Sequence, residues 1–241
     1  MIIEAAEFLK LAAYLVALVY CWRIRADHPH PARMRRAWSW LALSSALSVL
    51  RHAFELSGYL ANWELDRMSW RQILIVLALL ALTAGLLELA SAFRAVGFGL
   101  HWPRLDWLWL AAIVLLAVPV VLNRDRLGDA NSSVAAMRYL QYLSSLLLAV
   151  PAALALGLHR VSVEMTGGKW ATALQWMVAF LVARLVCLCL LTAVPDSWLA
   201  MTLLGTAAPW MFVLAAAERW NVTRAAERMS EQIFVGANKA S

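Results

Sequence analysis

The sequence predicts an all-α, polytopic integral membrane protein, a bundle of seven transmembrane helices with the N-terminus outside the cell and the C-terminus in the cytoplasm. Of its 241 residues, 63% are hydrophobic and only 15% are charged, whereas a soluble domain usually carries about 25% charged residues. The apolar residues gather in runs of roughly 20, the length of helix that crosses a ~30 Å hydrocarbon layer. The basic residues gather between these runs. Together these observations predict a membrane protein with no separate soluble domain.

Short polar connections divide the chain into seven apolar runs. The predicted spans are residues 4–23, 37–59, 70–93, 105–122, 135–158, 170–194 and 197–219. Turn-forming residues such as Pro31, Pro103 and Pro195 lie in the connections. The first run is preceded by Glu4 and Glu7 instead of a basic segment. A secretory signal peptide begins with basic residues, so we expect this run to persist as the first membrane helix.

The distribution of basic residues predicts the orientation of the bundle. Alternating the seven spans puts 13 of the 21 Lys and Arg residues on one side: Arg23, Arg25, Arg33, Arg35, Arg36, Arg94, Arg104, Arg160, Lys169, Arg219, Arg224, Arg228 and Lys239. Basic loops stay in the cytoplasm, so that side is predicted to be inside. These residues lie in short loops and not on one soluble face. The net charge of +6 therefore indicates contact with the lipid bilayer and its anionic headgroups, and not with nucleic acid. The Ala-, Leu- and Arg-rich composition favours a bacterial inner membrane as the location.

The C-terminal residues 220–241 are predicted to form a short cytoplasmic tail that is partly helical. Residues 218–234 contain no Pro or Gly and are rich in helix formers. Val222, Ala226, Met229 and Ile233 recur at spacings of four, three and four, which gives a narrow apolar stripe. Two interpretations fit this stripe: a helix that lies on the lipid surface, or a contact helix for a cytoplasmic protein partner.

Ionisable residues inside the predicted spans suggest a polar chamber. In the second span, Ser44, Ser48 and Glu55 follow helical spacing with Arg51 or His52 between them, so they share one face, and Arg51 and Glu55 are four residues apart and can pair. Residues of other spans are predicted to reach the same outer depth. The candidate lining is Arg51, His52, Glu55, Arg138 and Arg184, with Glu7 nearby. The arginines favour a small anionic ligand. The alternative is that these charges pair across helices and only stabilise the bundle. Glu88 is a separate intramembrane acid, expected near the inner end.

Metal and cofactor sites are not predicted. His52 and Glu55 have a spacing that can put two metal ligands on one helix face. A catalytic metal needs about three protein ligands, however. The other histidines lie at predicted inner ends or in loops: His28, His30, His101 and His159. Retinal proteins carry a lysine in the seventh helix, and the predicted seventh helix has none.

Two classes of function stay open at this point. The first is a sensory or regulatory membrane module, in which an outward-facing polar pocket acts through the last helix on a cytoplasmic partner. Pro209 lies inside that helix and provides a kink for such coupling. The second is a membrane transporter or a non-catalytic subunit of a larger complex. An enzyme is the least favoured class, because the sequence contains no recognisable set of catalytic residues.

Overall fold

The computed structural model describes residues 2–26, 32–61, 65–95, 132–166, 170–193 and 198–239, with side chains outside the description in several stretches, including 132–143 and 226–239. All six elements in these ranges are α-helices, which confirms the predicted all-α class for this part of the chain. The helices are α1 (Ile2–Ala26), α2 (Ala32–Ala61), α3 (Leu65–Ala95), α5 (Ser132–Thr166), α6 (Ala171–Ala193) and α7 (Trp198–Lys239).

Each of these helices overlaps one predicted span almost completely, and most extend it by several residues at the ends. The fourth predicted span, residues 105–122, lies outside the described residues. Within the described residues, three segments are long and apolar enough to cross a membrane: Trp70–Ala95, Ala171–Leu188 and Trp198–Ala225. The helices α1 and α2 do not meet this criterion of length and hydropathy. Both carry charged residues within their apolar stretches, such as Glu7 and Lys10 in α1 and Arg51 and Glu55 in α2.

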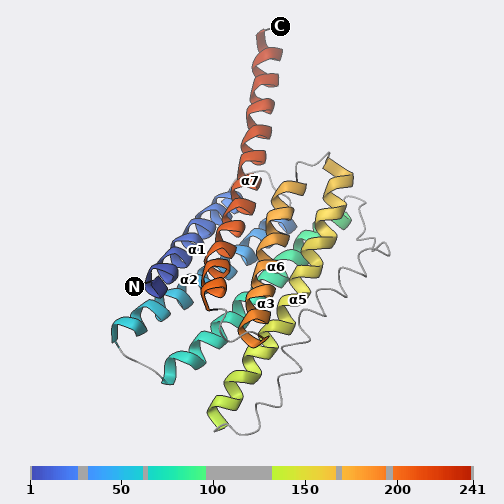
Figure 1. Ribbon diagram of the computed structural model, residues 1–241. Coiled ribbons are helices and arrows are strands. Elements are labelled where there is room, and N and C mark those ends of the chain that lie inside the picture. Colours follow the sequence, from blue (N-terminus) through green and yellow to red (C-terminus); the bar gives the residue numbers. More distant parts are fainter. Residues whose placement is uncertain are drawn as a thin grey trace.

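The six described helices form a closed ring (Figure 1). Along the chain α1 packs on α2, α2 on α3, α3 on α5, α5 on α6 and α6 on α7, and α7 returns to pack on α1. We call the end at which α1 begins the N-terminal end of the bundle. There α3, α5 and α7 also begin, and α2 and α6 end. Such a ring has an interior that all six helices can line, and the candidate site described below lies in it.

The outer surface of the ring is strongly apolar. On α1, for example, Phe8, Leu15, Val19 and Trp22 are all exposed and follow one another at spacings of seven, four and three residues, so they share a face. Similar exposed leucines and aromatic residues occur on the other helices, such as Leu203 of α7. Contiguous exposed apolar surface is rare on soluble monomers. It suits a protein whose exterior contacts lipid.

Small residues allow the helices to approach closely inside the ring. Ala13, Ala17 and Cys21 of α1 are fully buried at spacings of four, as is usual for helix contacts in membranes. Gly85 of α3 faces α2, where a Cβ atom would lie 3.0 Å from the Leu41 side chain and 3.2 Å from the Ala37 carbonyl oxygen. A side chain at position 85 would therefore force α2 and α3 apart.

The last helix is the longest and joins the interior of the ring to the C-terminal tail. The 42 residues of α7 correspond to a length of about 63 Å at 1.5 Å per residue. Its C-terminal part extends past the other helices (Figure 1). Pro209 lies inside α7 and has no N–H to donate to the carbonyl of Gly205, the residue four positions earlier. This missing bond marks the point at which α7 bends most easily.

Candidate ligand-binding pocket

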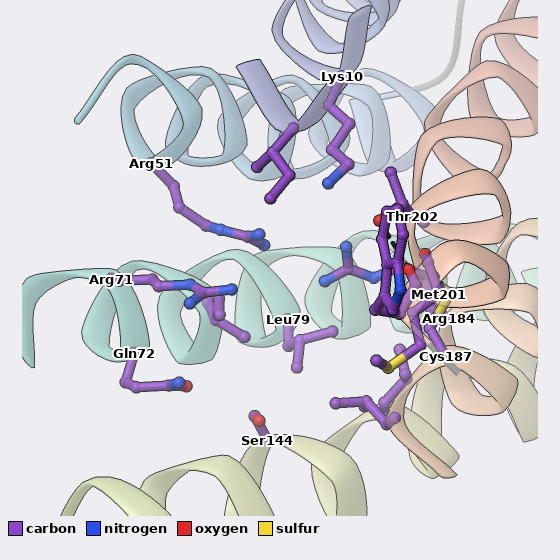
Figure 2. A pocket seen from close by; sticks show the side chains of 16 residues that line it. Lys10, Arg51, Arg71, Gln72, Leu79, Ser144, Arg184, Cys187, Met201 and Thr202 are labelled. Atoms are coloured by element: carbon purple, nitrogen blue, oxygen red, sulfur yellow. Dashed lines mark hydrogen bonds between the residues drawn. The ribbon is translucent and has the colours of Figure 1, made fainter. Parts of the chain in front are cut away.

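A cavity of about 490 Å³ opens at the N-terminal end of the bundle, and residues from all six described helices line it (Figure 2). Its lining residues are Ile3, Lys10, Arg51, Arg71, Gln72, Ile75, Leu79, Ser144, Leu148, Arg184, Cys187, Leu188, Trp198, Met201, Thr202 and Gly205. The volume is within the usual range for pockets that bind small molecules. We call this cavity the pocket.

The charged residues that line the pocket are all basic: Lys10 of α1, Arg51 of α2, Arg71 of α3 and Arg184 of α6. In Figure 2 the side chains of Lys10, Arg51 and Arg71 extend into the space between their helices, and Arg184 lies across from them beside Thr202. Among the described residues no carboxylate lines the cavity. The described lining of the pocket therefore carries positive charge from four basic side chains.

Behind the pocket wall, Glu7 and His52 form the first half of a buried polar network. The Lys10 ammonium donates to Oε1 of Glu7 at 2.5 Å, and the other carboxylate oxygen, Oε2, lies 2.6 Å from Nδ1 of His52. A carboxylate only accepts hydrogen bonds, so Nδ1 carries the proton of this contact. The His52 ring is fully buried and stacks on Tyr14 of α1, with ring centroids 5.5 Å apart. The network thus ties α1 to α2.

Glu55 forms the second half of the network. Its Oε1 accepts a hydrogen bond from Nε of Arg51 at 3.2 Å and forms an ion pair with Nε of Arg71 at 2.6 Å, so it joins α2 to α3. Its Oε2 lies 3.4 Å from Nδ1 of His52. We call Lys10, Glu7, His52, Glu55, Arg51 and Arg71 the polar network. Three of its members, Lys10, Arg51 and Arg71, also line the pocket, so a ligand bound there would contact the network directly.

Arg184 differs from the other three basic residues. It lies on α6, opposite the polar network, and among the described residues it has no ion-pair or hydrogen-bond partner. A second, small cavity of about 20 Å³ adjoins the pocket and is lined in part by Ser44, Ser48, Phe180 and Phe212. Arg51 and Arg184 are the charged residues that line both spaces.

The carboxylates and imidazole of the polar network bring three metal-binding groups together. Donor atoms of Glu7, His52 and Glu55 lie within 4.8 Å of one another, whereas the sequence suggested only His52 and Glu55. Each carboxylate, however, already accepts from Lys10, Arg51 or Arg71. If a metal ion bound here, the carboxylates would have to give up these interactions. The ion would also be repelled by three positively charged side chains at close range. The surroundings fit an ion-pair network better than a metal centre.

The structure brings most of the sequence-predicted residues together. Arg51 and Arg184 line the pocket, and Glu7, His52 and Glu55 lie directly behind Arg51. The predicted pair of Arg51 with Glu55 is present. The side chain of Arg138 lies outside the described residues, although its backbone is part of α5.

Glu88 is separate from this site. Its Oε1 lies 3.1 Å from Nε of Arg36, toward the opposite end of the bundle. Sequence reasoning assigned only Arg51 and Arg184 of the described lining residues to the chamber, and the polar residues that it missed include Lys10, Arg71 and Gln72. Arg71 and Gln72 follow directly after a predicted outer loop. Both residues lie near the start of a helix that is antiparallel to the helix of Arg51. Comparing the depths of these residues along the two helices could have placed them near Arg51.

At the opposite end of the bundle the basic residues have different surroundings. Arg219 of α7 is buried and lies over the Trp170 ring, 3.8 Å from its centroid. A shallow cavity of about 560 Å³ between the end of α1 and the start of α2 is lined by Trp22, Arg25, Ala26, Ala32, Arg35, Arg36 and Ser39. We call it the surface groove, because nearly all of these residues are exposed.

Comparison with known proteins adds no relative from which a function can be transferred: no protein-family model, curated protein or solved structure matches this chain.

Proposed function

We propose that this protein is a seven-helix sensory or regulatory module of a bacterial inner membrane, with an outward-facing pocket that binds a small anion. In this proposal the N-terminal end of the bundle faces outside, and the tail contacts a cytoplasmic protein through residues 218–234. The observation that carries it is the convergence of four basic residues, with no acidic one among the described lining, on a cavity that six helices line.

The topology is supported by the directions of the helices and by the charges at their ends. The helices α3 and α5 begin at the same end of the ring, which is the arrangement that seven alternating spans require. The surface groove at the opposite end presents three arginines and a tryptophan. Arginine-rich loops and tryptophans at the headgroup level are typical of the cytoplasmic face of a bilayer.

The lining of the pocket also supports a class of ligand. Beside the basic residues, large apolar side chains such as Ile75, Leu148, Leu188 and Trp198 contribute much of the wall. Glu7 and Glu55 are two carboxylates paired with three of the basic residues, and Arg184 adds a further positive charge, so positive charge is left for a ligand to balance. An anion with an apolar body, such as a medium-chain or aromatic carboxylate, fits both the charge and the apolar wall.

Signal output is assigned to α7. Trp198, Met201, Thr202 and Gly205 of this helix line the pocket, and the same helix continues without interruption to Lys239. Because Pro209 weakens the helix one turn beyond Gly205, a ligand that displaces the first turns of α7 can change the angle of the remainder. Ligand binding in the pocket thereby changes the orientation of the tail.

Octanoate binding to the protein in phosphatidylcholine nanodiscs tests the proposal. Octanoate should bind, while octanol, which lacks the charge, and acetate, which lacks the chain, should bind at least about tenfold more weakly. Arg184→Gln should weaken octanoate binding by about tenfold to a hundredfold, because it removes a charge-assisted hydrogen bond.

The matched control is Arg35→Gln, the same change in the surface groove, which should leave the affinity unchanged. Equal binding of octanol and octanoate, or an unchanged affinity in a folded Arg184→Gln protein, would rule out the proposed anion site.

A transporter is the second candidate, and the small cavity that adjoins the pocket beside Phe180 and Phe212 favours it. The two rings stack with centroids 5.3 Å apart and would serve as a gate. Uptake of labelled octanoate into proteoliposomes separates the two functions. A sensor binds without flux, whereas a transporter shows flux that increases in Phe212→Ala.

A further inference from the structure

We propose that His52 is a proton-binding site coupled to the pocket, so that the anion is bound together with a proton. This inference rests on the proposed anion-binding function and specifies which second ion accompanies the anion. It is drawn from the position of the His52 ring between two carboxylates and from the partners of those carboxylates in the pocket wall.

The hydrogen-bond geometry identifies the atom that takes up the proton. Nδ1 of His52 lies 2.6 Å from Oε2 of Glu7, so in the neutral ring this nitrogen carries the hydrogen. The free lone pair is then on Nε2, which is buried and has no hydrogen-bond partner among the described residues. An added proton binds there and converts the ring to imidazolium. The Nδ1 edge of that imidazolium faces two carboxylate oxygens, those of Glu7 and Glu55.

Charged groups from several helices face this ring. From α1 come Glu7, Lys10 and the hydroxyl-bearing ring of Tyr14, which stacks on His52. From α2 come Arg51 and Glu55, and from α3 comes Arg71. Arg184 of α6 faces the network across the pocket, and the α7 residues that line the pocket carry no charge.

The charges of these groups act in opposite directions on the protonation of His52, and a bound anion can change their net effect. The two carboxylates favour a protonated His52, and the three basic residues of the polar network oppose it. Those same residues, Lys10, Arg51 and Arg71, line the pocket. An anion bound there offsets their positive charge, so it removes the opposition and strengthens proton binding at His52. Coupling of this kind is reciprocal, and proton binding must therefore strengthen anion binding by the same factor.

Calorimetry measures the coupling directly. Octanoate is titrated into the nanodisc protein at one pH in buffers of different ionisation enthalpy, which gives the number of protons taken up per bound anion. We expect uptake of up to about one proton per octanoate in titrations run between about pH 5 and pH 8. Over that range the Kd should rise with pH, by up to about tenfold per unit.

His52→Asn is the test variant. An asparagine amide can keep a donor near the Glu7 carboxylate but cannot be protonated, so the variant should bind octanoate without taking up a proton. His159→Asn is the control, because His159 lies at the opposite end, where its Nδ1 is 3.0 Å from the Ala171 carbonyl oxygen. This control should behave as the wild type does.

A second measurement does not depend on any variant. Imidazole signals in the histidine-labelled wild-type protein should show one ring becoming protonated as octanoate is added. Octanoate binding without proton uptake, or uptake that persists in His52→Asn, would overturn the coupling and leave the anion site intact. Failure of octanoate to bind the wild type would instead remove the proposed function, and this inference with it.

Discussion

The bundle has two basic cavities of similar size at opposite ends, and they differ in enclosure. The surface groove measures about 560 Å³, and the described residues that line it belong to α1 and α2. The pocket measures about 490 Å³ and is lined by all six described helices. In the groove the Arg36 side chain is 58% exposed, whereas in the pocket wall the Lys10 and Arg51 side chains are 14% and 9% exposed and the Arg71 side chain is 44% exposed. The groove has three basic residues and the pocket has four, and the main difference is the deep burial of Lys10 and Arg51.

The two cavities therefore separate basic side chains held among several helices from basic side chains on an exposed surface. Exposed arginines interact with headgroups and solvent at a high effective dielectric, where each contact is weak and screened by salt. Arginines held inside the ring interact through a lower dielectric and must be balanced by fixed partners or by a ligand. Glu7 and Glu55 are fixed partners of Lys10, Arg51 and Arg71, whereas Arg184 has no ion-pair partner among the described residues.

The largest expected effect comes from removing one carboxylate at each end by the same substitution. Glu55→Gln leaves Arg51 buried without its carboxylate and should lower the free energy of unfolding by about 3 kcal/mol or more. Glu88→Gln removes the partner of the exposed Arg36 and should cost about 1 kcal/mol or less. Reversible unfolding in mixed micelles measures both values. Equal losses would mean that enclosure does not strengthen the interactions of the pocket.

A smaller effect is expected from two glycines that differ in their surroundings. Gly85→Ala puts a Cβ atom 3.0 Å from the Leu41 side chain and should destabilise the protein by about 1–3 kcal/mol through overpacking. At Gly205 the nearest atoms would be Sγ of Cys187 at 3.8 Å and Cε of Lys10 at 3.9 Å. These are ordinary contacts, so Gly205→Ala should fold with wild-type stability. The same unfolding assay compares the two variants, and a stability loss confined to Gly205→Ala would contradict the packing described here.

The smallest expected effect concerns the link from the pocket to the tail. Pro209→Ala restores the hydrogen bond from residue 209 to the Gly205 carbonyl and should straighten and stiffen α7. Octanoate affinity should change by about twofold or less, because no pocket contact is removed. Hydrogen exchange in residues 218–234 should respond to octanoate in the wild type and respond less in the variant. An undiminished response in Pro209→Ala would show that the bend is not used.

Much of the fold follows from the sequence, because apolar runs and basic loops act over short distances along the chain. Six of the seven predicted spans correspond to described helices, and the fourth lies outside the described residues. The ends of α7 were harder to predict, since residues after the apolar run contain neither Pro nor a helix-stopping Gly before Gly236. The number of crossings and the orientation stay predictions.

The candidate site was only partly predictable. Helical spacing was enough to gather Arg51, His52 and Glu55 on one face, because they belong to one helix. The contacts of Glu7 with His52 and of Glu55 with Arg71 join different helices. They depend on the rotation of each helix in the ring, which small residues such as Gly85 set through close packing. A single sequence does not encode that rotation in a readable pattern.

The most direct measurement of the central claim uses Cys187, which lines the pocket beside Arg184. With Cys21 and Cys189 replaced by alanine, Cys187 is the only thiol of the chain. In right-side-out vesicles, a membrane-impermeant thiosulfonate reagent carrying a sulfonate should modify it about tenfold faster than one carrying a trimethylammonium group, after correction for intrinsic reactivity. Octanoate should slow the reaction. Faster modification by the cationic reagent, or no protection by octanoate, would contradict an outward-facing pocket that selects anions.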